Sequence, residues 1–248
     1  MDLQLNGSVC LVSGASAGIG IGIVRVLARE GARLAITARR RDRLESVADE
    51  TGNRPLVVAI DLMREEAPRV IHDKVYAEFG RLDILVNNAG ASSPIDPLSS
   101  DAEWDAGFDI KFTTTRRLTN AFLPGMREQK WGRIINVSGI VEPFGTSAAQ
   151  AASAATHAWA KGLSRDLTHE GITVNCVPPG RINSEQILER LYPNEESRKA
   201  FIDAHIPIGR FGEPEELGHL VAFLASPLAG YITGTVIPVD GGMQRFAQ

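Results

Sequence analysis

The segment Ser13-Gly14-Ala15-Ser16-Ala17-Gly18-Ile19-Gly20 is the most informative stretch of the chain. The apolar run at residues 8–12 before it is typical of a short buried strand, and residues 20–30 after it have apolar side chains at helical spacing. Glycines at such a junction permit a sharp turn and a close approach of the backbone to a phosphate. The following helix offers free N–H groups and the positive end of its dipole. This context predicts a pyrophosphate site rather than an ordinary strand–helix turn that is merely rich in glycine.

Strand-like and helical segments alternate along the whole chain. The other predicted strands are residues 34–38, 55–61, 82–87, 132–138, 172–178 and 236–239. The predicted helices are residues 20–30, 41–51, 67–79, 104–126, 148–168 and 215–224. Near-continuous apolar strands that alternate with helices indicate a parallel sheet covered on both faces. The sequence therefore predicts one α/β domain over residues 1–248, a three-layer doubly wound parallel sheet of the Rossmann type.

Residues 183–207 are the segment with the weakest signals for regular structure. They carry many charges together with Pro193 and Pro207. We expect a loop or a mobile helical lid at the rim of the site, which would shape the substrate pocket. Its apolar side chains indicate a partly apolar substrate; they are Ile187, Leu188, Leu191, Tyr192 and Phe201.

Composition restricts the class of protein. A chain of 248 residues with 44% hydrophobic content can bury one sizeable core. Lys+Arg 26 against Asp+Glu 30 gives a net charge of -4, which favours neither nucleic acid nor an anionic membrane as partner. The two cysteines, Cys10 and Cys176, lie in apolar runs and are expected to be buried free thiols. Without a signal-peptide pattern or a membrane-length apolar run, the sequence predicts a soluble cytoplasmic protein. We further expect a small-molecule substrate and no metal site.

Further motifs extend this pattern beyond the glycine-rich turn. They are Asp61-Leu62, Asn87-Asn88-Ala89-Gly90, Gly132-Arg133-Ile134-Ile135-Asn136-Val137-Ser138, Gly171-Ile172-Thr173-Val174-Asn175, Pro179-Gly180 and Asp240-Gly241-Gly242. With them the chain resembles, over its whole length, the short-chain dehydrogenase/reductase family, of the 3-oxoacyl-carrier-protein reductase type. The family's Thr-Gly-x-x-x-Gly-x-Gly motif appears with Ser13 in place of Thr.

The resemblance implies a nicotinamide dinucleotide cofactor and a set of contacts to it. The turn would hold the pyrophosphate through Ser13, Gly14, Ser16, Gly18, Ile19 and Gly20. Asp61 and Leu62 would contact the adenine, whereas Asn88, Ala89 and Gly90 would line the central ribose. Pro179, Gly180 and Ile182 would flank the nicotinamide, and Ser184 stands where the family often has a Thr that holds the carboxamide.

The end of the strand at residues 34–38 favours NADP(H) over NAD(H). NAD binders usually end this strand with an acid that holds the ribose 2′-OH, but here Asp42 comes only later, in the helix. A guanidinium matches the oxygens of a 2′-phosphate. Arg39 is therefore the expected partner, assisted by Ser16 and Arg40. The alternatives are a solvated basic start of the helix and use of NAD(H).

The resemblance also implies four catalytic groups: a Ser that orients the carbonyl, a Tyr that transfers the proton, a Lys one turn later, and an Asn that holds a water. Ser138 matches the first. Counting back from residues 171–175, the Tyr position falls on Ala149 and the Lys position on Ser153, because one inserted residue would rotate every later side chain by about 100°. The Asn position falls on Lys111. Three of the four groups are therefore expected to be replaced, and losing a general acid costs about 10²–10⁴ in rate.

Four other side chains are candidates to take over the missing roles. Lys111, if it points inward, would donate a proton, anchor a carboxylate or form an imine; otherwise it extends to the surface. His157 has a suitable pKa but is more readily explained as a packed or interface histidine, and its neighbour Lys161 lies about 12 Å beyond the expected lysine. Gln150 is expected to hydrogen-bond a ligand. Glu142 is either an acid or a solvated loop carboxylate.

Three functions follow from these expectations. The first is an NADP(H)-dependent oxidoreductase on a carbonyl or alcohol, with an atypical proton donor. The second is a catalytically inactive, cofactor-binding pseudoenzyme or partner subunit, including the case of an inactivated variant. The third is a non-redox lyase or hydratase that uses Lys111 and Ser138. The resemblance further implies a homodimer or homotetramer in which residues 104–126 and 148–168 pack against their symmetry mates and residues 236–239 help form a second interface.

Overall fold

Six parallel strands form the central sheet of the computed structural model, which describes residues 1–90, 95–140 and 142–246. Their order is β3-β2-β1-β4-β5-β6. The strands are β1 Val9–Ser13, β2 Arg33–Ala38, β3 Leu56–Ala59, β4 Ile84–Asn87, β5 Gly132–Val137 and β6 Ile172–Val177. All five neighbouring pairs are parallel, as expected for strands joined by crossover helices.

Helices connect these strands and cover both faces of the sheet. The α-helices are α1 Ile19–Arg29, α2 Arg41–Thr51, α3 Ala67–Phe79, α4 Asp101–Phe108, α5 Thr114–Gln129, α6 Ala148–Leu167, α7 Glu195–His205 and α8 Pro214–Ala225. Short π-helices span Asp109–Thr113 and Gln186–Leu191, and 3-10 turns span Thr168–Glu170 and Pro227–Ala229. Within the described ranges, no helix is long and apolar enough to cross a membrane.

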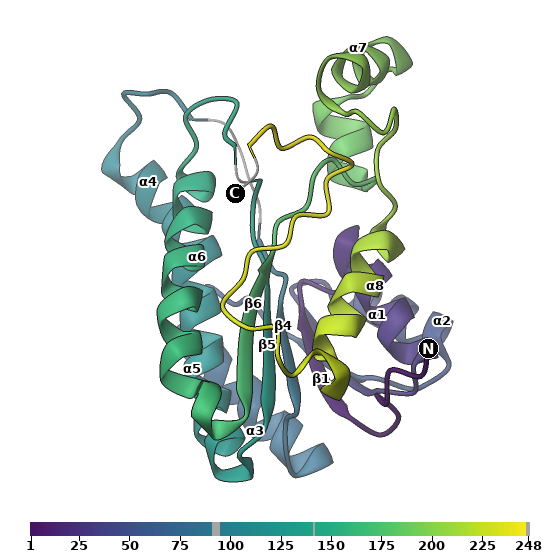
Figure 1. Ribbon diagram of the computed structural model, residues 1–248, viewed down its shortest axis with the longest axis vertical. Helices are drawn as coiled ribbons and strands as arrows, with labels where there is room; N and C mark the ends of the chain where they lie inside the picture. The colour runs from purple at the N-terminus through teal and green to yellow at the C-terminus, as the bar shows by residue number, and fades with distance from the viewer. Residues whose placement is uncertain (91–94, 141, 247–248) are drawn as a thin grey trace.

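The layers follow from two separate apolar clusters. Figure 1 shows α1, α2 and α8 on one face of the sheet and α3, α5 and α6 on the other. Ile23, Leu27 and Leu217 belong to the first cluster, and Ile71 and Phe122 belong to the second; all five side chains are fully buried. This arrangement confirms the predicted three-layer doubly wound fold. Cys10 and Cys176 are buried free thiols, as expected, and burial raises the pKa of Cys176 to about 12.

The predicted strand at residues 236–239 is wrong. Among the described residues, the segment makes only two isolated parallel bridges, Cys176 with Val236 and Pro179 with Val239. Val239 N donates to Pro178 O at 3.0 Å, and Cys176 N donates to Thr235 O at 2.9 Å. Pro178 has no N–H to continue the ladder between these two points. The segment therefore lies beside β6 without forming a regular strand.

The lid at residues 183–207 is mainly helical. Pro193 precedes the N-cap residue Asn194, whose side chain accepts a hydrogen bond from Ser197 N at 2.8 Å, and Pro207 follows the C-cap residue Ile206. The two prolines therefore bound α7 rather than preventing it. Lid side chains pack in a third apolar cluster that includes Ile206, Phe211, Met243, Tyr192 and Phe201.

The helix expected at residues 104–126 is divided in two. The π-helical turn Asp109–Thr113 separates α4 from α5. A π-turn inserts an extra residue into the helical repeat and redirects the side chains it carries, and such turns are frequent at functional sites. Lys111 lies at its centre.

Candidate functional site

The candidate site lies where the strand order reverses. Strands β1 and β4 are neighbours at the centre of the sheet, and ligands of open α/β sheets bind outside the carboxyl ends of the strands at this position. Because all strands are parallel, the segments after β1, β4, β5 and β6 meet at one edge. The structure thereby brings together the residues predicted from four separate motifs.

The glycine-rich turn has a geometry that only glycine permits. Gly14 has φ 66°, and a Cβ there would lie 2.7 Å from the Cα of Ala89. A Cβ on Gly20 would lie 2.2 Å from the carbonyl oxygen of Gly14. At Gly18, where φ is 51°, the added Cβ would lie 2.9 Å from the Cβ of Ser184. The turn is thus closed against the segments after β4 and β6.

Ser13 and Asn88 hold this turn in place. The hydroxyl of Ser13 accepts hydrogen bonds from the backbone N–H groups of Asn88 at 3.0 Å and of Ala89 at 3.1 Å. The Asn88 side-chain amide donates to the carbonyl oxygens of Ser13 at 2.9 Å and of Gly14 at 3.1 Å. Ser13 therefore supplies the hydroxyl that the family motif takes from Thr, and the Asn88 side chain shapes the turn rather than extending away from it.

The start of α1 is suited to an anion. The N-cap residue is Gly18, no side chain caps the helix, and no acidic residue lies in its first turn. The first N–H groups and the positive end of the helix dipole are therefore available to a ligand, with Ser16 and Ile19 beside them. Together with a turn that has no room for a Cβ, this opening fits a dinucleotide pyrophosphate.

Arg39 is an exposed cation at the carboxyl end of β2, and it pairs with no carboxylate in the described part of the chain. Its neighbours differ, because Arg41 pairs with Glu45 at 3.5 Å and Arg43 pairs with Glu185 of the lid. Arg39 and its neighbour Arg40, which is also exposed and without an ion pair in the described residues, are therefore the guanidinium groups available to an added phosphate.

The other residues predicted to contact the cofactor lie along the same edge. Asp61 follows β3, where its carboxylate accepts a hydrogen bond from Met63 N at 3.0 Å, and Leu62 is buried. Ile182 is 3% exposed and bridges to Gly212. Pro179 and Gly180 follow β6 and pair with the segment at Val239 and Asp240.

Lys111 points toward this edge. A Cβ added to Gly90 would lie 2.5 Å from both Cε and Nζ of Lys111, so the ammonium lies against the backbone of the segment after β4. Burial lowers the pKa of Lys111 to about 8. The structure therefore favours the inward orientation over extension to the surface.

Ser138 and His157 form a hydrogen-bonded pair. Ser138 is 5% exposed at the end of β5, and its Oγ lies 2.7 Å from Nε2 of His157 on α6. Burial lowers the pKa of His157, so its ring is neutral at neutral pH. A neutral ring either accepts the Ser138 proton or donates its own, depending on the tautomer. The sequence favoured a packing role for His157, and the structure adds this direct contact with Ser138.

The residues at the positions that the resemblance assigns to Tyr and Lys are buried. Ala149 and Ser153 are 5% and 2% exposed, and the Ser153 hydroxyl donates to the Ala149 carbonyl at 2.8 Å within α6. Gln150 lies in the first turn of α6, where its backbone N donates to Ser147 Oγ at 3.4 Å. Lys161 lies against Gly234, away from Ser138.

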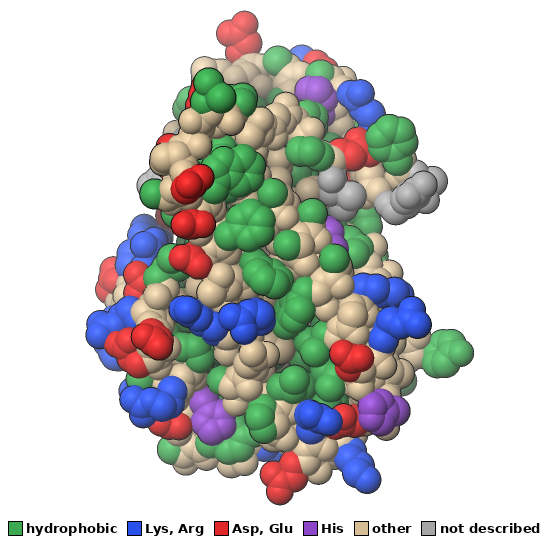
Figure 2. Space-filling model, turned by 90° about the vertical axis from the view of Figure 1, so that its left-hand side faces the viewer, with side chains coloured by type: hydrophobic (Ala, Val, Ile, Leu, Met, Phe, Trp, Pro, Cys, Tyr) green, Lys and Arg blue, Asp and Glu red, His purple; other side chains and the backbone are tan. Residues whose placement is uncertain are grey.

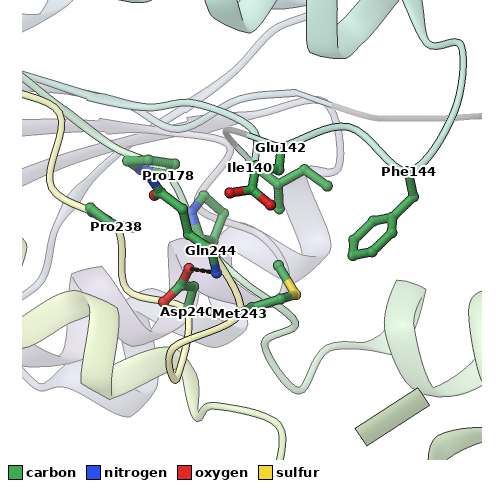
Figure 3. Close-up of a pocket in the computed structure, with 9 residues that line it drawn as sticks. Ile140, Glu142, Phe144, Pro178, Pro238, Asp240, Met243 and Gln244 are labelled. Atoms are coloured by element: carbon green, nitrogen blue, oxygen red, sulfur yellow. Dashed lines mark hydrogen bonds between the residues drawn. The ribbon is translucent and has the colours of Figure 1, made fainter. Parts of the chain in front are cut away.

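A small pocket lies between the loop after β5 and the C-terminal segment. Its lining includes Ile140, Glu142, Phe144, Pro178, Pro179, Pro238, Asp240, Met243 and Gln244 (Figure 3). The Glu142 carboxylate accepts hydrogen bonds from the backbone N–H groups of Arg245 at 2.7 Å and Phe246 at 3.0 Å. Glu142 thus anchors the C-terminal segment, which argues against a role as free acid.

Arg181 is a residue that the sequence motifs did not single out. It stands between Gly180 and Ile182, both of which were expected near the nicotinamide. Its Cζ lies 5.1 Å from the ring centroid of Phe201, 5.8 Å from that of Tyr192 and 5.9 Å from that of Phe144. The sequence feature that could have pointed to Arg181 is its position directly after the Pro179-Gly180 pair.

Comparisons with known proteins agree with this geometry. Residues 14–244 match the family model described as Enoyl-(Acyl carrier protein) reductase. The chain is 38% identical to 3-oxoacyl-(acyl-carrier-protein) reductase FabG of Vibrio cholerae, over 97% of this chain and 99% of that one. It is 34% identical to the FabG reductase of Escherichia coli, again over 97% and 99%.

Solved structures show the same relationship. The crystal structure of L-sorbose reductase from Gluconobacter frateurii, complexed with NADPH and L-sorbose, matches with a TM-score of 0.94 and 32% identity, over 99% of this chain and 100% of that one. The active-site complex of Pseudomonas aeruginosa RhlG with NADP matches with a TM-score of 0.89 and 31% identity, over 97% and 98%. The chain belongs to the short-chain dehydrogenase/reductase family.

Proposed function

We propose that the protein is an NADP(H)-dependent oxidoreductase that interconverts a carbonyl and an alcohol, with Lys111 in place of the usual phenol. The observation that carries the proposal is the position of the Lys111 ammonium against Gly90, at the edge of the sheet where Ser138 follows β5. The relatives described above are reductases, and two of the matching structures contain NADPH or NADP.

Binding of the cofactor is assigned to groups that the turn and β2 present. The N–H groups at the start of α1 would hold the pyrophosphate, and Arg39 would hold the 2′-phosphate through its planar fork of donors. The lid residue Ser184, which touches Gly18, would close over the bound dinucleotide. When bound, the cofactor would supply the hydride that adds to the carbonyl carbon in reduction, or take up the hydride that leaves the carbinol carbon in oxidation.

Proton transfer is assigned to Lys111. A general acid is most effective when its pKa is near the working pH, and a value of about 8 leaves Lys111 mostly protonated at neutral pH with a proton that is readily given up. In the direction of reduction, an N–H bond of the ammonium breaks, the proton passes to the substrate oxygen, and the resulting amine is reprotonated from solvent. The reverse path serves alcohol oxidation.

Ser138 is assigned the orientation of the substrate oxygen. If the Nε2–H tautomer of His157 donates to Ser138 Oγ, the serine hydroxyl proton is free to bond the substrate carbonyl. In the other tautomer, the serine oxygen is free to accept from an alcohol. The pair therefore suits both directions of the reaction. Gln150 would add a hydrogen bond to the ligand.

A second candidate function is that of a cofactor-binding subunit without catalysis. The observation that favours it is the Ser153 hydroxyl, which bonds within its own helix to Ala149 and presents nothing to a ligand. At these two positions the resemblance places the Lys and Tyr of the family. A non-redox lyase or hydratase that uses Lys111 and Ser138 is the third alternative.

Oxidation of NADPH over a panel of aldehydes and ketones tests the proposal. Lys111→Met should lower the rate about 10²–10⁴-fold and leave the dissociation constant of NADPH unchanged, whereas the exposed-lysine control Lys74→Met should behave as wild type. Recovery of bound NADPH unchanged with every carbonyl would support the cofactor-binding subunit without catalysis. A gain of activity in the double variant Ala149→Tyr with Ser153→Lys would then show that the family's Tyr and Lys are the groups it lacks. Product without NADPH consumption would support the non-redox reaction.

We also propose a homodimer or homotetramer through the face formed by α4, α5 and α6. Figure 2 shows a band of hydrophobic side chains along this face. On α6, Ala154 and Ala158 are exposed, and Trp159 is partly exposed in edge-to-face contact with Phe112. Small exposed residues permit close packing of symmetry-related helices. Light scattering of the purified chain, with Ala158→Glu as the disrupting variant, measures the state of assembly.

A further inference from the structure

Arg181 is a cation beside the expected nicotinamide position, and one of its donors, the buried Nε–H group, lacks an acceptor within the described residues. It lies in the loop after β6, directly following Pro179 and Gly180. Its Nε atom is buried and has no hydrogen-bond partner in the described chain. Nearly all buried polar groups in native proteins are hydrogen-bonded, so an exception of this kind calls for a partner that the chain itself does not provide.

Aromatic rings surround the guanidinium without satisfying it. Phe201 and Tyr192 come from the lid, and Phe144 comes from the loop after β5, at 5.1–5.9 Å from Cζ of Arg181. A ring face attracts a cation, but it is not an acceptor comparable to an oxygen for the five N–H donors in the guanidinium plane. The cluster therefore fixes the position of the side chain and leaves its directional bonds unmade.

The carboxylates that line the adjacent pocket are already engaged. Glu142 accepts hydrogen bonds from two backbone N–H groups of the C-terminal segment at 2.7 and 3.0 Å. Asp240 accepts from the backbone N–H groups of Gly242 at 3.0 Å and Gln244 at 2.8 Å. Neither is among the ion pairs of the described ranges, and neither is Arg181. The described part of the chain therefore offers Arg181 no carboxylate, and a ligand oxyanion would supply the missing negative charge.

We propose that Arg181 binds an oxyanion of the substrate, a carboxylate or a phosphate monoester carried on an apolar stem. A guanidinium matches two oxygens of either group, and the lid rings would pack the stem. Phe144 links Arg181 to the pocket beside the loop after β5, since its ring lies 5.9 Å from Cζ of Arg181 and it lines that pocket together with Ile140 and Pro179. The inference rests on the proposed function, because it assigns a substrate class to the same site.

Calorimetric titration without cofactor tests this assignment separately from catalysis. The probes are phenylacetate and phenyl phosphate as oxyanions, with phenylacetamide as the neutral match. Wild type should bind at least one oxyanion about tenfold or more tightly than the amide, as expected for a charge-assisted bidentate contact. Arg181→Met should reduce this preference to within about twofold. Lys199→Met is the matched control, since it removes an exposed lid cation that pairs with Asp203 at 2.7 Å, and it should keep the preference.

Equal binding of the anions and the amide by wild type, or no binding of any probe, would overturn the assignment without a variant. An unchanged preference in Arg181→Met would overturn it as well. If Arg181→Met does not fold, Arg181→Lys should retain the charge but bind the oxyanion less tightly than wild type, because it lacks the planar fork. The more tightly bound oxyanion identifies the head group. None of these results depends on turnover, so a failure of the proposed oxidoreductase activity would be recognised separately.

Discussion

Replacement of Lys111 by Met should stabilise the protein at neutral pH while it impairs catalysis. Burial lowers the pKa of Lys111 from 10.5 to about 8. A shift of one unit in pKa corresponds to about 1.4 kcal/mol, so holding the charged side chain at this position costs about 3 kcal/mol of folding free energy. Met fills the space of the alkyl chain and carries no charge. The expected gain in unfolding free energy is therefore up to about 3 kcal/mol, or about 2–4 °C in Tm for each kcal/mol in a chain of this length.

The direction in which the stability difference between wild type and Lys111→Met changes with pH shows whether the buried charge of Lys111 is its cause. Between pH 8 and 10.5 the unfolded chain holds a proton on Lys111 that the folded chain has lost, so the stability of wild type rises relative to the variant across this window. The advantage of Lys111→Met should be complete below pH 8 and should disappear by pH 10.5. Urea unfolding of both proteins across this range measures it, with Lys74→Met as control. A variant that is destabilised at neutral pH, or one whose advantage does not change with pH, would refute the reasoning.

Three further predictions concern the cofactor turn, Arg39 after β2 and the Ser138–His157 pair. Gly20→Ala should cost about 1–3 kcal/mol of stability and weaken NADPH binding, because the added Cβ would lie 2.2 Å from the Gly14 carbonyl oxygen. Urea unfolding measures the stability and fluorescence titration measures the dissociation constant of NADPH. An unchanged unfolding free energy together with an unchanged dissociation constant would contradict this prediction. Arg39→Ala should weaken NADPH binding about 10–100-fold and leave the affinity for NADH within about twofold of wild type, as measured by equilibrium titration. An equal loss of affinity for NADPH and NADH would exclude a contact between Arg39 and the 2′-phosphate. Burial lowers the pKa of His157, so this side chain binds a proton more readily in the unfolded chain than in the folded one. The wild-type protein should therefore lose stability as the pH falls below 6.5, and His157→Asn should lose less. Unfolding free energies that fall equally with pH in the two proteins would rule out this contribution of His157.

Much of the fold could be predicted from local patterns. The helices at Arg41–Thr51 and Ala67–Phe79 have the expected bounds, because each is followed by a glycine in the left-handed region, Gly52 or Gly80. The segment at residues 236–239 has the apolar composition of a strand, but its pairing depends on Pro178, which is far away in sequence. A pattern within one segment carries no information about the hydrogen-bonding capacity of its neighbour.

The candidate site was predictable where backbone conformation determines it. The positions of Gly14, Gly18 and Gly20 follow from the turn they form. The contact between Ser138 and His157 was not predictable, because it joins the end of a strand to the third turn of a helix through side-chain rotamers. The surroundings of Arg181 depend on three aromatic rings from separate segments, which spacing along the chain does not bring together.

The most direct test of the account is the fate of the hydride. The protein is incubated with NADPH that carries deuterium at the transferable position of the nicotinamide, together with a carbonyl substrate, and the product is analysed by mass spectrometry. The account predicts an alcohol that contains the deuterium on its carbinol carbon, at a rate that falls about 10²–10⁴-fold in Lys111→Met. NADPH that binds saturably and returns with its deuterium in place, whatever carbonyl is supplied, would contradict it.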